Sequence, residues 1–428
     1  MRAWLVLLLI VPFVSALVME TAGVAGEHPV LYGDLIVYER SGTVYLYDLA
    51  EKAESEIGRG NSPFLFGYTV VFETKEADVD LNDDGDVEDT VIQYGNVRDK
   101  TIFSTKAVGR HPNVFSDVIV FSTKESELGV DFSNDGDSDD DIVRMYDVKS
   151  GEVSNLKAVG DFPVMNKQAL IFLTDEKQLG TDLNADGDKL DVVLRVYDTV
   201  NHQVANTKIV AGRPVLVAKS NDAVFSSDGK LVVFDAVAHQ GQLTGIEAVN
   251  PSIFGDVVVF ERAGDLYGFS LKSKRSAKMN ILGSQPSVFE STVVFVSSEK
   301  ELGDLNNNGR ADEFVIRYAK EEDLDGDGVL DFVDNCPAVV NVDQVDSNNN
   351  GVGDGCDKET KLEEPVKEDK IEEKTESNAT ENAVSESSES SGISWYWYFL
   401  IILLLPFAFF VCKFGYRYYK KRQKSFGF

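Results

Sequence analysis

The chain is poor in the residues on which most catalytic sites depend. It has three cysteines and four histidines in 428 residues. It contains no Gly-x-Ser-x-Gly, no His-Glu-x-x-His, no phosphate-binding loop and no Cys-x-x-Cys. Basic residues are also scarce, because 41 Lys and Arg face 72 Asp and Glu, for a formal net charge of −31. Nucleic-acid binding needs a basic surface, so we expect no nucleic-acid partner, and we expect a protein that is not an enzyme.

Acidic residues, in contrast, form one pattern four times. Oxygen-bearing side chains recur at alternate positions, with a glycine at position 6 and a last acid at position 10. Such loops wrap a hard cation, and position 7 binds through its backbone carbonyl, so Arg310 fits there. Plain Asp-Gly hairpin turns are the alternative, but they do not need this set of acids in every copy. The predicted calcium ligands are Asp80, Asn82, Asp84, Asp86 and Asp89; Asp131, Ser133, Asp135, Asp137 and Asp140; Asp182, Asn184, Asp186, Asp188 and Asp191; and Asp304, Asn306, Asn308, Arg310 and Glu313.

The spacing of these loops predicts a repeat protein. The first three begin at residues 80, 131 and 182, which are 51 residues apart. Each repeat opens with a proline and an apolar, β-rich run, and a second such run follows, as in Val44-Tyr-Leu-Tyr-Asp48. Short strands at even spacing predict an all-β, seven-bladed β-propeller over residues 17–320, with an open solenoid or two sandwiches as alternatives. The seven openings start at Pro29, Pro63, Pro112, Pro163, Pro214, Pro251 and Pro286.

The seventh repeat lacks a fourth strand. It ends near Tyr318, and no strand signal follows it. Residues 21–27, which precede the first repeat, have the character of that missing strand. We therefore expect the N-terminal strand to complete the last blade and close the ring, which would leave no open sheet edge.

The repeat openings also resemble a known family. The Pro-x-x-x-Gly-Asp-x-Ile/Val-Val-Phe opening with its Tyr-x-Tyr-Asp strand is similar to the blades of TolB-like propellers, over roughly residues 28–320. The resemblance implies blades that act as a binding platform, and it implies no reaction.

Residues 321–357 resemble a thrombospondin type 3 repeat. The resemblance rests on two Asp-x-Asp/Asn-x-Asp/Asn-Gly loops, the Asp-Asn-Cys-Pro junction and the Asn-x-Asp-Gln that precedes the second loop. It implies a segment with almost no core that folds around calcium, in which Asn348 and Asn350 replace the usual aspartates and weaken the second site. The implied ligands are Asp323, Asp325, Asp327 and Asp331, then Asp346, Asn348, Asn350 and Asp354, with Asp334, Asn341, Asp343 and Asp357 as bridging or outer groups.

Cys336 and Cys356 flank the second of these loops. An even number of cysteines, here two, in a secreted segment predicts a disulfide. Two free thiols are the alternative, and a zinc site is disfavoured because no histidine lies nearby.

The two ends of the chain predict a single-pass protein of the cell membrane. Residues 1–16 have the features of a signal peptide, and the apolar run 393–412 is long enough to span a bilayer. The basic tail 413–428 predicts a cytoplasmic C-terminus and an extracellular N-terminal bulk. Residues 358–392, rich in Glu, Lys and Ser, predict a disordered acidic stalk with a glycosylation sequon at Asn378.

These features favour a calcium-binding propeller at the cell surface that acts as a binding or adhesion module. Its partner would be an extracellular protein or polysaccharide. The alternatives are an ectoenzyme that acts on glycan or peptide at the propeller centre, and a structural component of a surface layer. An enzyme should show titratable groups with shifted pKa values at the channel mouth, whereas a binder should show an exposed aromatic or apolar patch.

Overall fold

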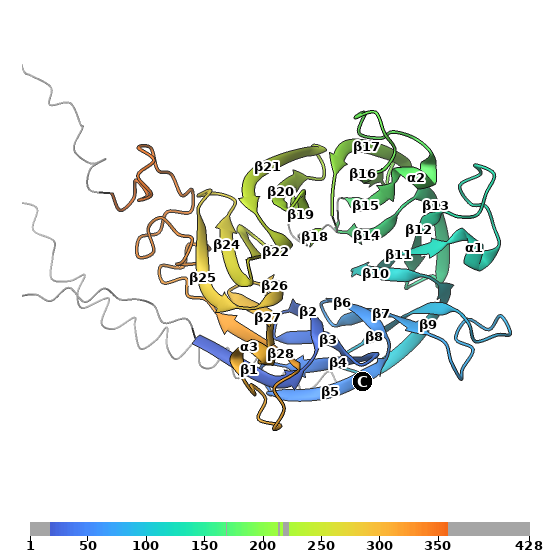
Figure 1. Cartoon of the computed structure of the whole chain (residues 1–428), viewed down its shortest axis with the longest axis horizontal. Helices are drawn as coiled ribbons and strands as arrows, with labels where there is room; N and C mark the ends of the chain where they lie inside the picture. The colour runs from blue at the N-terminus through green and yellow to red at the C-terminus, as the bar shows by residue number, and fades with distance from the viewer. Residues whose placement is uncertain (1–17, 168, 213–214, 217–221, 358–428) are drawn as a thin grey trace, which may run out of the picture. The chain divides into compact units, whose positions relative to one another are not determined.

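A computed structural model of the chain describes residues 18–167, 169–212, 215–216 and 222–357. These residues form seven antiparallel sheets of four strands each. The first strand of each sheet contacts the first strand of the next, and β26 of the last sheet contacts β2 of the first, so the sheets form a closed ring (Figure 1). The prediction of an all-β, seven-bladed propeller is confirmed.

The strands follow one another from the centre of the ring outward. Blade one contains β2 (Glu27–Tyr32), β3 (Leu35–Arg40), β4 (Thr43–Asp48) and β5 (Ala53–Arg59), and blade two contains β6 (Asn61–Phe66), β7 (Thr69–Lys75), β8 (Thr90–Asn96) and β9 (Thr101–Val108). Blade three contains β10 (Arg110–Phe115), β11 (Val118–Lys124), β12 (Asp141–Asp147) and β13 (Glu152–Val159), and blade four contains β14 (Asp161–Met165), β15 (Leu170–Asp175), β16 (Val192–Asp198) and β17 (Gln203–Val210).

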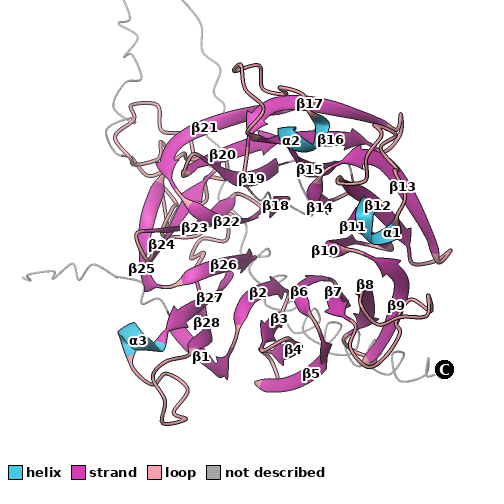
Figure 2. Cartoon of the chain, turned by 45° about the vertical axis from the view of Figure 1, so that its right-hand side comes forward, coloured by secondary structure: helices cyan, strands magenta, loops and turns pink. Residues whose placement is uncertain are grey.

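Blade five contains β18 (Val215–Leu216), β19 (Asp222–Ser227), β20 (Lys230–Asp235) and β21 (Gln240–Glu247), and blade six contains β22 (Val249–Phe254), β23 (Val257–Arg262), β24 (Asp265–Ser270) and β25 (Ser276–Leu282). Blade seven combines β26 (Ser284–Phe289), β27 (Thr292–Ser298) and β28 (Phe314–Lys320) with the N-terminal strand β1 (Val18–Ala25). The helices in the described residues are single turns of four residues, namely α1 (Glu125–Leu128), α2 (Glu176–Leu179) and α3 (Glu299–Leu302) (Figure 2).

The N-terminal strand closes the ring, as expected. Strand β1 pairs antiparallel with β28, from Val18 opposite Lys320 to Ala25 opposite Val315. The strand begins and ends slightly earlier than the expected residues 21–27. Since β1 covers the outer edge of β28, the first and last parts of the propeller share one sheet.

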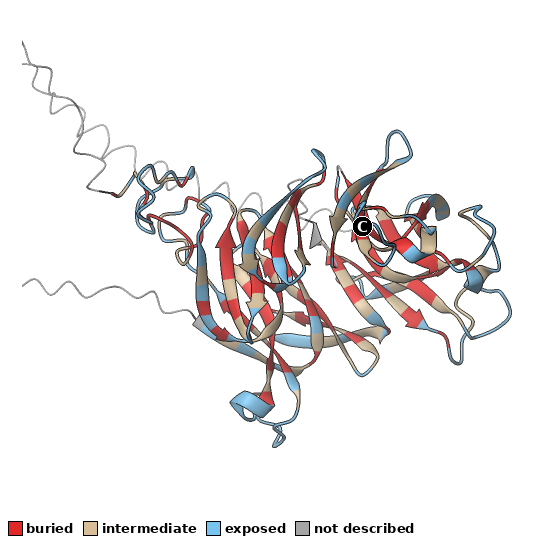
Figure 3. Cartoon of the chain, turned by 45° about the horizontal axis from the view of Figure 1, so that its top comes forward, coloured by how far each residue is buried: buried red, intermediate tan, exposed pale blue. Residues whose placement is uncertain are grey.

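The second strand of each blade forms its core. Ile36, Val37 and Tyr38 of β3 are fully buried, and so are residues 70–72 of β7. Both faces of each sheet are covered by neighbouring blades, which explains why these strands are continuous apolar runs without alternation. The outer strands, such as β5, carry mostly exposed or half-buried residues (Figure 3).

A glycine precedes the inner strand of most blades because an aromatic ring lies against it. A Cβ atom added to Gly160 would lie 2.3 Å from the ring of Phe172, and one added to Gly109 would lie 2.4 Å from that of Phe121. Gly26, Gly60 and Gly283 approach Tyr38, Phe72 and Phe295 in the same way. A larger residue there would displace the aromatic side chain from the core.

Residues 321–357 pack against blade six. Val329 and Val333 are fully buried in a cluster that includes core residues of blades six and seven. The main-chain carbonyl of Val333 accepts a hydrogen bond from Ser273 Oγ at 3.1 Å, and that of Asp334 accepts one from Arg275 Nη1 at 2.5 Å. The segment therefore has little core of its own but shares the core of the propeller.

The expected location as a single-pass membrane protein requires correction. None of the helices in the described part of the chain is long and apolar enough to cross a membrane. The predicted signal peptide 1–16, stalk 358–392 with Asn378, span 393–412 and tail 413–428 all lie outside the described residues.

Candidate metal centres

The four acidic loops connect the second and third strands of their blades, as predicted. They span residues 76–89 in blade two, 125–140 in blade three, 176–191 in blade four and 299–313 in blade seven. They project from the circumference of the ring (Figures 1 and 2). Blade one separates the loop of blade seven from the other three, which lie on consecutive blades.

The first aspartate shapes each loop. The Asp80 carboxylate accepts hydrogen bonds from the backbone N–H of Asp83 at 2.6 Å and from that of Gly85 at 3.0 Å. Asp131 and Asp182 make the same pair of bonds. Both donors have left-handed backbones, with φ of 64° at Asp83 and 103° at Gly85, so the chain curls around the side chains. The loop conformation is therefore built by the chain itself.

A buried glutamate at the start of each loop was missed by the sequence analysis. Glu76, Glu125, Glu176 and Glu299 are at most 4% exposed. Each carboxylate accepts backbone N–H groups of its loop; Glu176, for example, accepts from Leu183 at 2.6 Å. A signal was present, because each glutamate stands four residues after the aromatic residue of the second strand, where the blades without a loop have Gly42, Gly229 and Gly264.

Carboxylate oxygens converge in three of the four blade loops. Within each group one ligand atom per residue lies within 4.8 Å of the others. Two of the groups include a missed glutamate. The groups are Glu76, Asp86 and Asp89 in blade two, Asp135, Asp137 and Asp140 in blade three, and Glu176, Asp188 and Asp191 in blade four.

The loop of blade three leaves two buried carboxylate oxygens without a hydrogen-bond partner. Asp140 is 1% exposed and Glu125 is fully buried, yet Asp140 Oδ2 and Glu125 Oε2 have no hydrogen-bond partner. Burial, together with the negative charge of Asp135, raises the pKa of Asp140 to about 7. A divalent cation would satisfy both oxygens and favour the ionised form.

In blades two and four an asparagine amide bridges the acids. Asn82 Nδ2 donates to Asp84 Oδ2 at 3.0 Å and to Asp89 Oδ2 at 2.8 Å. Asn184 donates to Asp191 in the same way, at 2.7 Å. Blade three has Ser133 at this position, and its hydroxyl donates to Asp131. The amide explains why the last acids of blades two and four have hydrogen-bond donors that Asp140 Oδ2 lacks.

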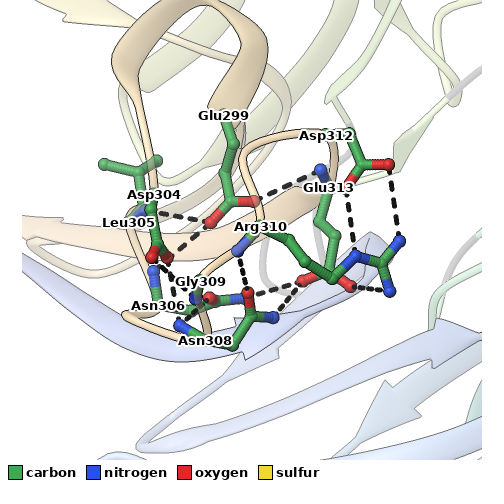
Figure 4. Close-up of polar contacts among 9 residues, drawn as sticks. All are labelled: Glu299, Asp304, Leu305, Asn306, Asn308, Gly309, Arg310, Asp312 and Glu313. Carbon is green, nitrogen blue, oxygen red and sulfur yellow. Dashed lines mark hydrogen bonds and ion pairs between the residues drawn. The ribbon is translucent and has the colours of Figure 1, made fainter.

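The loop of blade seven carries a positively charged side chain, that of Arg310, among its acids (Figure 4). Arg310 Nη1 lies 3.3 Å from Glu313 Oε1, and Arg310 Nε donates to Asp312 at 3.1 Å. Asn306 and Asn308 also donate to Glu313, which lowers the pKa of this carboxyl. The carboxylates of this loop therefore have partners from within the chain, and the calcium site predicted here stays a prediction.

The segment 321–357 contains a further acidic group. Oxygens of Asp323, Asp325 and Asp327 converge within 4.8 Å. Asp325 Oδ2 and Asp334 Oδ2 are buried without a hydrogen-bond partner, and burial raises the pKa of Asp325. The second loop differs, because Asn348 and Asn350 donate their amide protons to Asp357 at 2.9 and 3.0 Å. Uncompensated charge in this segment thus lies at the first loop.

The predicted disulfide is present. Cys336 and Cys356 are bonded, with their Cα atoms 5.7 Å apart. The bridge joins the start and the end of the part of the segment that holds the second loop.

Comparisons with known proteins find a likeness in fold. No family model matches the chain, and no curated protein is similar to it in sequence. An oligogalacturonate lyase from Vibrio parahaemolyticus is 11% identical, with a TM-score of 0.46 over 72% of this chain and 91% of the lyase. TolB from Acinetobacter baumannii is 13% identical, with a TM-score of 0.38 over 63% of this chain and 65% of TolB.

The β-propeller domain of the Trilobed protease from Pyrococcus furiosus is 11% identical, with a TM-score of 0.46 over 68% of this chain and 92% of that domain. Identities and TM-scores this low carry no inference about activity. The assignment of a seven-bladed propeller rests on the strand pairing of this chain.

Proposed function

We propose that this chain is a calcium-binding β-propeller that serves as a binding module. Its cations would be held by the blade loops and by residues 321–357. The observation that carries the proposal is the loop of blade three, where Asp135, Asp137 and Asp140 converge and where one buried oxygen each of Asp140 and Glu125 lacks a partner. Leaving an ionised carboxylate buried and unpaired costs several kcal/mol, about 3–5 when a partner is removed, and a bound cation offsets that cost.

Calcium fits this donor set better than other common cations. The group in blade three offers oxygen ligands alone, all of them carboxylates, and calcium accepts such ligands in a variable geometry. Magnesium demands a near-octahedral shell and keeps several waters, and zinc prefers nitrogen and sulfur ligands. Calcium loops of this ligand type have dissociation constants that range from about 10⁻⁹ to about 10⁻³ M, set by the charge of the ligands and the rigidity of the site.

Calorimetric titration of the full chain with calcium chloride tests the proposal. The wild type should bind calcium at several sites, and Asp140→Asn should lose the site of blade three. Asp139→Asn is the matched control, because this exposed neighbour carries the same charge but belongs to no converging group. If Asp140→Asn binds as many ions as Asp139→Asn, blade three is not a calcium site.

Thermal melting gives a second measurement. Without calcium, Asp140→Asn should melt higher than the wild type, because it removes a buried, repelled charge. With calcium at 100 times the dissociation constant, each occupied site should add about 2.7 kcal/mol to the free energy of unfolding. Calcium should therefore raise the melting temperature of the wild type more than that of the variant. Equal gains in the two proteins would refute the assignment.

An enzyme with its site in the central channel is the second candidate. His111 Nδ1 lies 2.7 Å from Asp161 Oδ1 beside the channel, and Ser122 donates to the same oxygen. Burial raises the pKa of Asp161, but the hydrogen bond and charge of His111, with hydrogen bonds from Ser122 and the Phe162 backbone, outweigh this effect and lower it. An ionised carboxylate that is already hydrogen-bonded suits a supporting role better than proton transfer. Incubation with oligosaccharides and detection of shortened products would separate an enzyme from a binder.

A further inference from the structure

A groove lies between blades one and two, which are neighbours in the ring (Figure 1). Its volume is about 790 Å³, within the range of about 300–1,000 Å³ that is typical of ligand sites. Its lining comes from four hairpin turns and the strand ends beside them: the turns β2–β3 and β4–β5 of blade one, and the turns β6–β7 and β8–β9 of blade two. The acidic loop of blade two does not contribute to it, so the groove is separate from the candidate metal centres.

The two walls of the groove carry opposite charges. Blade one supplies the acidic lining residues, namely Asp34, Asp48, Glu51 and Glu54. Blade two supplies the basic ones, Arg98 and Lys100. Both blades are described without a gap, so this division of charge is a property of the two blades themselves.

Other blades neutralise the charged residues of these turns within a single blade. In blade three, Lys149 Nζ of the turn β12–β13 lies 2.6 Å from Asp117 Oδ2 of the turn β10–β11. In blade six, Asp256 and Lys272 occupy the same two positions, and the backbone N–H of Lys272 donates to Asp256 at 2.8 Å. An aspartate in the first turn of a blade thus has its basic partner in the third turn of the same blade.

Blades one and two divide this pair between them. Blade one has Asp34 in its first turn, but its third turn has Ala50 at the position of Lys149. Blade two has Arg98 in its third turn, but its first turn has Tyr68 in place of the acid. The acid and the cation that neither blade neutralises therefore line the same groove.

The acidic wall has two carboxylates available to a ligand. The carboxylate of Asp48 accepts the backbone N–H of Glu51 at 3.0 Å, and Glu54 Oε1 lies 2.9 Å from Arg40 Nη1, so both of these acids are engaged within blade one. The side chains of Asp34 and Glu51 are exposed and have no partner among the described residues. They can accept hydrogen bonds from an ammonium group.

The basic wall holds its guanidinium in a fixed orientation. The guanidinium carbon of Arg98 lies 3.6 Å from the centroid of the Tyr68 ring, and Arg98 Nη2 donates to the Tyr68 hydroxyl. The remaining N–H groups can pair with a carboxylate in a bidentate manner. Lys100, exposed in the same turn, adds a second positive charge. A ligand of one sign would be repelled by one of the two walls, whereas a ligand that carries both signs can pair with both.

We infer that this groove binds an extended peptide in which basic and acidic side chains alternate. Successive side chains of an extended chain point to opposite sides, so alternation turns the basic side chains toward blade one and the acidic side chains toward blade two. Tyr68, which is 41% exposed, and the buried Leu46 and Val97 add apolar surface for the aliphatic stems of these side chains. The inference rests on the proposed function as a binding module and names its partner class, but it uses none of the acidic loops.

Titration of the full chain with a capped hexapeptide of alternating lysine and glutamate tests the inference. Two further capped hexapeptides have glutamine in place of every lysine or of every glutamate. The alternating peptide should bind most tightly, and its affinity should fall as the salt concentration rises. Equal affinity for the three peptides, or no binding of the alternating peptide at low salt, overturns the inference.

Ala50→Lys tests the acidic wall, because it gives Asp34 the partner that Asp117 has in blade three. The variant should bind the alternating peptide about two- to fivefold more weakly, the loss expected for an exposed ion pair, and should lose the preference for lysine. Arg98→Gln should weaken binding by a similar factor and lose the preference for glutamate. Val200→Lys is the matched control, because it adds the same charge at the same turn position of blade four, where Val200 is 81% exposed. Equal weakening by Ala50→Lys and Val200→Lys would contradict the assignment to this groove.

Each titration is repeated with calcium and with chelator. Peptide binding that persists in chelator supports the groove even where the calcium proposal fails. Peptide binding that requires calcium would show that an acidic loop holds the peptide, and it would overturn the inference while leaving the calcium proposal intact.

Discussion

Single residues decide how each acidic loop balances its charge. In blade three, one oxygen of Asp140 and one of Glu125 have no partner, whereas blades two and four insert Asn82 and Asn184 between their acids and blade seven inserts Arg310. The loops share one backbone design but differ in how many of their carboxylate oxygens have partners within the chain. Because the backbones match, exchanging residues between loops tests the role of each side chain.

The charge of Asp140 makes stability depend on pH. In the metal-free protein its pKa is raised from the ordinary value near 4 to about 7, mainly by burial. Between these values the folded state binds more protons than the unfolded state, so stability should fall as pH rises from about 4 to 7. Melting in the presence of chelator should show this decline, and Asp140→Asn should flatten it. An equally steep decline in the variant would contradict the assignment to Asp140.

Calcium should reverse this trend. The ion binds the deprotonated carboxylate, so the affinity of blade three should fall by about tenfold per pH unit below the pKa. Calorimetry at pH 6 and pH 8 measures the difference. A constant affinity across this range would show that Asp140 does not take part.

Replacing Arg310 with an acid should make the loop of blade seven resemble the proposed calcium loops of blades two, three and four. Arg310→Asp removes the ion pairs to Asp312 and Glu313 and places an acid at position 7, as in the other loops. Without calcium the loss of stability should be small, because the pairs are exposed to solvent. The calcium affinity of the blade-seven loop should then be higher in the variant than in the wild type. Arg262→Asp, which removes the exposed pair with Glu247, is the control and should add no calcium affinity.

Among the elements, the segment 321–357 depends on strand β24 of blade six. The ring of Phe332 rests on Gly268, where an added Cβ atom would lie 2.0 Å from Phe332 Cε2. Since Val329 and Val333 enter the same core, the position of the first acidic loop of the segment is tied to the propeller. Loss of calcium should therefore loosen the segment without releasing it completely.

Gly268→Val should displace this segment. The new side chain occupies the place of the Phe332 ring, and forced overpacking costs about 1–3 kcal/mol. Limited proteolysis should then cut residues 321–357 faster than in the wild type, while the seven blades stay resistant. Ser276→Val on the adjacent strand β25 is the control, because Ser276 is exposed. Equal cleavage of both variants would show that Phe332 does not anchor the segment.

The whole molecule depends on the closure of its ring. Strand β1 pairs with β28, and Tyr318 of β28 donates to Glu20 of β1 at 2.6 Å. Without β1 the edge of β28 would be unpaired and available to other chains.

A chain that begins at Glu27 should therefore melt at a lower temperature and aggregate. Thermal melting and light scattering measure the two effects. Glu20→Gln, which keeps the strand but weakens its polar contacts with Tyr318 and Lys52, should have a much smaller effect. An unchanged melting temperature in the shortened chain would mean that β1 adds nothing to closure.

The sequence alone determined the features that depend on local pattern. The proline-led apolar runs predicted seven blades, the missing last strand predicted closure by the N-terminus, and the paired cysteines predicted the disulfide. The acidic loops were placed correctly between second and third strands. Strand period and turn chemistry act over a few residues, so they can be read along the chain.

The tertiary structure decided which distant groups meet. Glu125 approaches Asp140 because two strands of one sheet bring the ends of the loop together. Phe332 finds Gly268 only after blade six has formed, and His111 stacks on Phe162 only because two blades adjoin at the channel. These contacts depend on how sheets pack and on how the ring closes. Such packing brings together residues that are far apart in the chain, so these contacts cannot be predicted from local sequence periodicity.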